Sequence, residues 1–85
     1  METEEKTLRT PTIKVVTTNG TLEGKVEMLY SRNVYLGFYT WYIENYSDKE
    51  FFIMVTTEGN DVVIKTSSIV YIEEIEPGEG KDVNW

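Results

Sequence analysis

The chain has 85 residues, with 8 Lys or Arg against 15 Asp or Glu, so its formal net charge at pH 7 is -7. A chain of this length forms one domain at most, and the absence of cysteine excludes disulfides and thiolate metal sites, which fits a reducing compartment. Histidine is also absent, which removes the commonest general base and the commonest transition-metal ligand. We therefore expect neither an enzyme nor a bound metal or cofactor.

The chain shows no sign of a membrane segment. No apolar run approaches the roughly 18 residues that a membrane span requires, and the first ten residues are charged and lack the apolar region of a signal peptide. We therefore expect a soluble, cytoplasmic protein that does not bind a membrane. Most of the negative charge lies in residues 73–85, and the nearly neutral body has no broad basic surface for duplex DNA, although a local basic spot is compatible with it.

The first half of the chain begins with residues 1–11, which are polar and predict a flexible arm that ends at Pro11. Apolar and polar residues then alternate along 12–18, which is typical of a strand, and Asn19-Gly20 predicts a tight hairpin turn. Residues 21–30 continue as a strand with one polar face. Gly24 interrupts its buried face and predicts a bend of the kind that curls a small barrel.

The second half begins with a short turn at 31–33 and a long aromatic strand over 33–45, both faces of which are apolar. A further strand is predicted for the stretch EFFIMVTT, followed by a turn at 58–61. VVIKTSSIVYI then contains two strands joined by a tight break, whose short hydroxyl side chains can bond to backbone groups. The remaining residues, 77–85, form an acidic tail.

Five or six short strands with no helical period predict an all-β fold. An open sheet of this size would leave two exposed edges and little core, and a bent, partly closed sheet avoids both problems. We therefore expect a small, strongly bent antiparallel barrel of the SH3-like or Sm-like type, formed by residues 12–76.

Three stretches resemble the Sm-like (LSm) family. IKVVTTNGTLEGKV resembles the opening of the family's first motif, with its alternating strand, turn glycine and bent strand. NVYL resembles the segment that carries a base-reading asparagine, and IKTSSIVYI resembles the second motif. The match departs at Tyr30, where the family has an acidic residue, and at Thr66, where it has glycine.

The resemblance implies a non-enzymatic homo-oligomer, such as a ring, that binds single-stranded RNA. It places Asn33 on the base-reading asparagine and Lys65 on the basic residue that flanks the base, and Arg32 or Tyr35 would stack on the base. The alternative is that Asn33 is a turn residue and Lys65 an exposed strand charge.

The aromatic residues between 35 and 52 exceed what one core of this size holds, so we expect self-association. The expected interface residues are Tyr39, Trp41, Phe51, Ile53 and Val55, the last three of which alternate along a predicted edge strand. A second hypothesis is therefore an SH3-like protein-interaction or assembly module without a nucleic-acid ligand. No catalytic carboxylate pair is expected, because Glu23 and Glu27 would lie about 13 Å apart on a strand.

Overall fold

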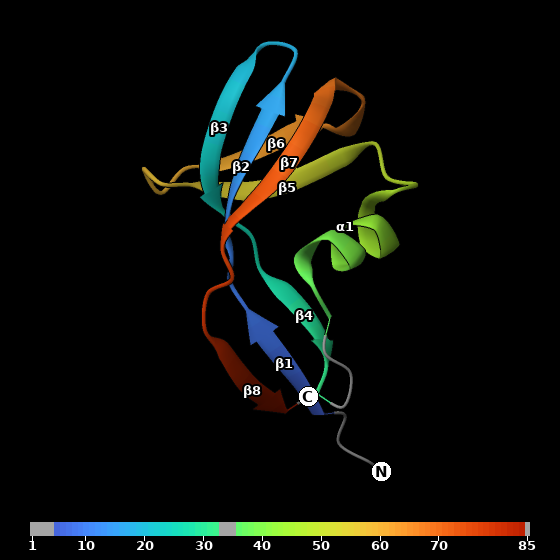
Figure 1. Ribbon diagram of the computed structural model, residues 1–85, viewed down its shortest axis with the longest axis vertical. Helices are drawn as coiled ribbons and strands as arrows, with labels where there is room; N and C mark the ends of the chain where they lie inside the picture. The colour runs from blue at the N-terminus through green and yellow to red at the C-terminus, as the bar shows by residue number, and fades with distance from the viewer. Residues whose placement is uncertain (1–4, 33–35, 85) are drawn as a thin grey trace.

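The computed structural model describes residues 5–32 and 36–84 (Figure 1). Two antiparallel sheets and one short helix make up most of this part of the chain, so the fold is mostly β, in place of the all-β fold expected from the sequence. In chain order the elements are β1 (Glu5–Arg9), β2 (Thr12–Thr17), β3 (Gly20–Lys25), β4 (Met28–Ser31), α1 (Phe38–Tyr46), β5 (Phe51–Thr56), β6 (Asp61–Lys65), the 3-10 turn η1 (Thr66–Ser68), β7 (Ile69–Glu76) and β8 (Gly80–Asn84).

Three continuous stretches of chain each supply one strand to both sheets. The larger sheet has the order β6-β5-β3-β2-β7, and the smaller one has the order β4-β1-β8. Because β1 leads into β2, β3 into β4 and β7 into β8, the order β7-β2-β3 of the large sheet repeats as β8-β1-β4 in the small one. The molecule is elongated, with extents of 46 × 27 × 19 Å, and Figure 1 shows the small sheet at one end and the large sheet at the other.

The large sheet stays open. Its end strands are β6 and β7, and although η1 joins them in sequence, the strands that the structure describes form no closed barrel. The predicted break in VVIKTSSIVYI is confirmed as η1. Its hydroxyls bond to the backbone as expected, from Thr66 Oγ1 to the carbonyl of Lys49 (2.6 Å) and from Ser68 Oγ to that of Lys65 (2.7 Å).

The predicted aromatic strand over 33–45 is wrong, because residues 38–46 form the helix α1. Phe38 and Trp41 are buried, and Tyr42 and Tyr46 pack partly against the core, which is the spacing of one helix face. The helix lacks the usual capping signals: its N-cap is Gly37, with no side-chain hydrogen bond. The helix is therefore stabilised by the packing of its aromatic face against the core, and not by capping hydrogen bonds or by the helix propensity of its residues.

The predicted arm and tail both contribute strands. Within residues 1–11, β1 pairs with β4 and β8, and within 77–85, β8 pairs with β1. These pairings arise because β1 extends β2 and β8 extends β7, which are already neighbours in the large sheet. The link between β7 and β8 includes Gly78, whose positive φ of 72° and close approach to the backbone of Thr10 exclude a side chain.

The structure modifies the predictions for Gly20 and Gly24. The hairpin of β2 and β3 is confirmed, but its two-residue turn is Thr18-Asn19, and Gly20 begins β3. At Gly24 an added Cβ would clash with the carbonyl oxygen of Val55, so this glycine permits a close approach of β3 to β5. The two strands pair only at Gly24 and Lys25, after which the chain leaves the large sheet toward β4.

The core lies between the large sheet and α1 (Figure 1). Phe52 is fully buried, and its ring contacts those of Tyr42 and Tyr46 edge-on, with centroids 5.3 and 4.9 Å apart. The buried hydrophobic residues are Ile13, Val15, Val26, Met28, Phe38, Trp41, Phe52, Met54 and Ile64.

One charged side chain is buried where the two sheets join. The Arg9 guanidinium donates to Glu74 Oε2 (3.3 Å), to the carbonyl of Pro77 (3.1 Å) and to the carbonyl of Leu36 (2.9 Å). It thus connects the end of β1 with β7, with the β7–β8 link and with the chain that leads into α1. Such a buried charge is tolerated because Glu74 and two carbonyl groups pair with its two terminal nitrogens.

Candidate functional site

The outer face of β5 and β6 is apolar. The two strands pair with Phe51 opposite Lys65, Ile53 opposite Val63 and Val55 opposite Asp61. Because side chains alternate along a strand, Phe52, Met54 and Ile64 point into the core, and their neighbours point outward. We call the outward apolar residues the outer β5–β6 surface; they are Phe51, Ile53, Val55 and Val63, which are 52%, 57%, 40% and 63% exposed.

Charged residues border this surface. Lys65 and Asp61 stand at the two ends of β6, and Lys25 of β3 lies opposite Val55 on the other side of β5. All three are exposed. An apolar centre with a charged rim is the usual make-up of a surface that packs against another protein surface.

The five interface residues predicted from the sequence do not lie on one surface. Phe51, Ile53 and Val55 do lie together and exposed, as expected, but β5 is not an edge strand, because β6 lies outside it. Tyr39 is exposed on α1, where its hydroxyl accepts a hydrogen bond from the Glu74 N–H (3.1 Å). Trp41 is a core residue, only 6% exposed, so it does not belong to the exposed surface. Val63 also belongs to this surface and was not expected there, because the alternation of VVIK gains a meaning only when β6 pairs with β5.

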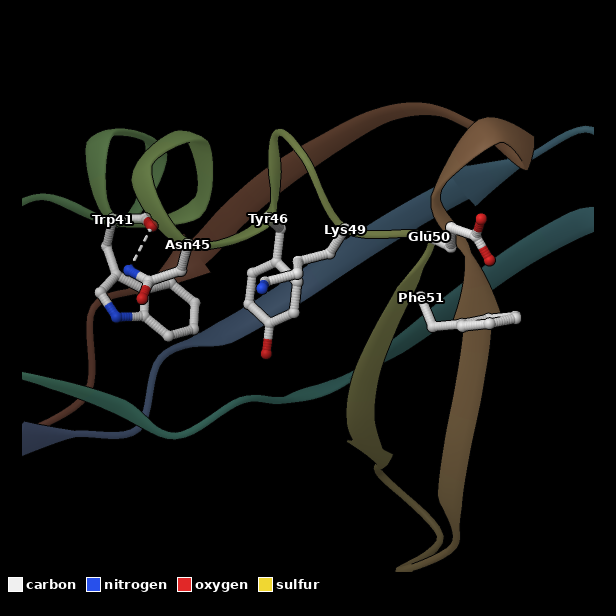
Figure 2. Close-up of a pocket in the computed structure, with 6 residues that line it drawn as sticks. All are labelled: Trp41, Asn45, Tyr46, Lys49, Glu50 and Phe51. Carbon is white, nitrogen blue, oxygen red and sulfur yellow. Dashed lines mark hydrogen bonds between the residues drawn. The ribbon is translucent and has the colours of Figure 1, made fainter.

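A hollow of about 390 Å³ lies where α1 runs into β5. Figure 2 shows Asn45 bonded through its amide nitrogen to the Trp41 carbonyl (2.8 Å), and the Lys49 side chain extending toward the ring of Tyr46. Phe51 and Glu50 complete the lining. The hollow therefore combines aromatic rings, an amide and one cation.

A neighbouring hollow of about 420 Å³ brings Lys65 close to Lys49. The two chain segments are joined because the Thr66 N–H donates to the Glu50 carbonyl (2.8 Å). Lys65 also lies opposite the exposed Phe51 on β5, although Asp48 and Glu50 line the same hollow as the two lysines and balance their charge. Nothing in the sequence pattern distinguished Lys49, since only the tertiary pairing brings it to Lys65.

The other predicted RNA-binding residues are not gathered at this place. Asn33 and Tyr35 lie outside the described residues. Arg32 follows β4 at the far end of the small sheet, where it pairs with Glu5 (3.3 Å) and Asp82 (3.4 Å). The structure therefore does not bring Arg32 and Lys65 together (Figure 1).

Two tyrosines near the first hollow have raised pKa values. Burial raises the pKa of the Tyr42 phenol above its ordinary value, and the neighbouring Tyr46 raises it further; burial also raises the pKa of Tyr46. Their rings stack with centroids 5.6 Å apart. Both phenols are therefore neutral hydrogen-bonding groups at neutral pH.

In the part of the chain that the structure describes, no group of three or more acidic side chains is placed to hold a metal ion. No helix among residues 5–32 and 36–84 is long and apolar enough to cross a membrane. The chain matches no protein-family model, and comparisons with the curated proteins and with the solved structures find no match.

Proposed function

We propose that this chain is a non-catalytic assembly domain that forms a homo-oligomer, with the outer β5–β6 surface as its contact. The observation that carries the proposal is the exposed pair of Ile53 and Val63 at the centre of that surface. Burying one such aliphatic side chain stabilises a contact by about 1.5–3 kcal/mol, so two copies that cover this surface gain a substantial free energy.

Charge also favours this surface over the rest of the molecule. A net charge of -7 makes copies of the chain repel one another. Around the outer β5–β6 surface, three lysines lie among four acids, so the local charge is closer to neutral than that of the chain as a whole; these residues are Lys25, Lys49, Lys65, Glu27, Asp48, Glu50 and Asp61.

The proposed fold is an open form of the small SH3-like or Sm-like barrel. The strand order supports this: β2, β3, β5 and β6 follow one another across the sheet, and η1 then leads into β7, which returns to pair with β2. The likeness to the Sm-like motifs belongs to this proposal, as does a cytoplasmic setting, which the lack of cysteine supports.

The experiment is size-exclusion chromatography of the wild type and of Ile53→Lys, which places a charge in the middle of the apolar surface. We expect the wild type to elute as an oligomer and Ile53→Lys to elute as a monomer with unchanged circular dichroism. The matched control is Thr21→Lys, which adds the same charge at an exposed position of β3 and should still elute as an oligomer. A variant Ile53→Lys that assembles like the wild type would refute the proposal.

A second candidate function, single-stranded RNA binding, is favoured by the position of Lys49 and Lys65 beside the exposed Phe51. Lysines can hold phosphates while an aromatic ring stacks on a base, and such binding depends strongly on salt. The test is fluorescence anisotropy with a short uridine-rich oligonucleotide at low salt. Binding that Lys49→Ala with Lys65→Ala abolishes, and that Lys81→Ala on β8 preserves, would support it, and absence of wild-type binding would exclude it.

A further inference from the structure

The large sheet has two end strands, and they differ in how open they are to another strand. The pairing of β7 with β2 shifts register twice, between Thr12 and Ile13 and between Val16 and Thr17. The Tyr39 hydroxyl also occupies the Glu74 N–H on this strand. Register shifts and covered edge groups both prevent a new strand from pairing. By contrast, β6 pairs with β5 in unbroken register, and no described strand lies beyond it.

The backbone of β6 offers hydrogen-bonding groups at three alternate positions. At the two ends of its pairing with β5, the Thr66 N–H bonds to the Glu50 carbonyl and the Thr56 N–H bonds to the Asn60 carbonyl. Hydrogen bonding alternates along an antiparallel strand, so Val62 and Ile64 bond to β5. The peptide groups of the other residues of β6 therefore point away from β5; these are Asp61, Val63 and Lys65.

We infer that β6 pairs antiparallel with β6 of a second copy, about a two-fold axis at Val63; this rests on the proposed function and adds an edge contact to the face contact proposed there. Val63 then lies opposite Val63 of the second copy. Asp61 lies opposite Lys65 of the second copy, and Lys65 opposite its Asp61, so both ends of the strand pair are charge-matched. The Lys65 carbonyl is already used by η1, which it caps and whose Ser68 Oγ donates to it, so at each end of the new strand pair the Lys65 N–H donates to the Asp61 carbonyl of the other copy.

The same register joins the apolar surfaces of the two copies. Ile53 lies opposite Val63 within one chain, so a row runs from Ile53 through Val63 to Val63 and Ile53 of the second copy. A slip of one residue would turn every side chain of one strand to the opposite face, and a parallel arrangement in register would set Asp61 against Asp61. Charge and the direction of the side chains thus favour the same antiparallel register, and a two-fold axis needs only this one self-complementary strand.

Charge reversal tests the register. In Asp61→Lys, both ends of the pair would set lysine against lysine, and in Lys65→Asp, both ends would set aspartate against aspartate. We expect the dissociation constant of each variant alone to rise about tenfold or more over that of the wild type, measured by sedimentation equilibrium. An equimolar mixture should regain wild-type affinity as a heterodimer, because each lysine then meets an aspartate. The double variant Asp61→Lys/Lys65→Asp should also associate like the wild type.

The outcomes separate the two proposals. A wild type that stays monomeric refutes both the proposed function and this register. A wild type that associates, with single reversals that associate equally well or a mixture that regains nothing, leaves the proposed function standing and refutes the register. Circular dichroism of each variant confirms that the exposed substitutions leave the fold intact.

Cross-linking provides a second measurement, because the chain has no native cysteine. In the inferred register the two Val63 Cα atoms lie about 5.5 Å apart, which a disulfide can span. We expect Val63→Cys to form a covalent dimer rapidly under mild oxidation. The matched control is Thr21→Cys, an exposed position on β3 that lies outside both contacts. Equal cross-linking of the two variants would overturn the inference.

Discussion

Ile53 and Val63 lie opposite each other on β5 and β6, with 57% and 63% of their surfaces exposed. Phe52, adjacent to Ile53 on β5, and Ile64, adjacent to Val63 on β6, are buried in the core. An antiparallel sheet with one solvated face usually carries polar residues on that face. Here both faces of β5 are apolar, which is the feature that the proposed self-association explains.

The two adjacent phenylalanines of β5 should differ sharply in their effect on stability. Phe52→Ala removes a fully buried ring that contacts Tyr42 and Tyr46, so we expect a loss of about 3–5 kcal/mol in the free energy of unfolding. Phe51→Ala removes a half-exposed ring and should cost less than about 1 kcal/mol. Urea denaturation at low protein concentration, where association contributes little, makes the comparison. Equal losses would mean that the two faces of β5 are assigned the wrong way round.

Gly24→Ala should weaken the junction of β3 and β5. Its Cβ would collide with the Val55 carbonyl, which is backbone and cannot move away alone, so we expect a loss of about 1–3 kcal/mol. Gly37→Ala is the matched control, because nothing lies within 4 Å of its added Cβ. Thermal unfolding of the two variants gives the comparison. A Gly24→Ala variant as stable as the wild type would rule out the close approach of the two strands.

The buried guanidinium of Arg9 should contribute far more to the free energy of unfolding than that of Arg32. Arg9→Met leaves Glu74 and two carbonyl groups without their donor, and we expect it to cost about 3 kcal/mol. Arg32→Met removes ion pairs to Glu5 and Asp82, which are exposed carboxylates, and should cost less than about 1 kcal/mol. Chemical denaturation of both variants tests this. Comparable losses would contradict the role of Arg9 at the junction of the sheets.

Stability should fall at alkaline pH because of Tyr42 and Tyr46. Their folded-state pKa values are raised above 10.0, chiefly by burial, so the folded protein binds more protons than the unfolded chain above that pH. The associated stability is complete below pH 10 and is lost as pH rises through the folded pKa values. Denaturation midpoints measured across this range should fall less in Tyr42→Phe/Tyr46→Phe than in the wild type.

Much of the fold could be predicted from local patterns. The alternation along β2, β3 and β5, the turn before β6 and the polar break at η1 are all visible in the sequence, because each depends on neighbouring residues. The helix α1 was missed for a physical reason. Its aromatic residues have strong strand preference, and its N-cap, Gly37, gives no start signal, so only packing against the core reveals the helical spacing of Phe38, Trp41 and Tyr42.

The candidate site was only partly predictable. The exposed alternation of Phe51, Ile53 and Val55 is a local pattern and was expected. The partnership of Val63 with Ile53, and the approach of Lys49 to Lys65, depend on the pairing of β5 with β6 and on the bonds of Thr66. The burial of Trp41 depends on the helix, so the error in the aromatic segment carried over into the predicted interface.

Sedimentation equilibrium of the wild-type chain and of Ile53→Lys over a range of concentrations tests the self-association most directly. We expect the wild type to show a mass of at least two chains that falls toward one on dilution, and Ile53→Lys to show the mass of one chain throughout. A wild type with the mass of one chain at every concentration would contradict the assembly role of the outer β5–β6 surface.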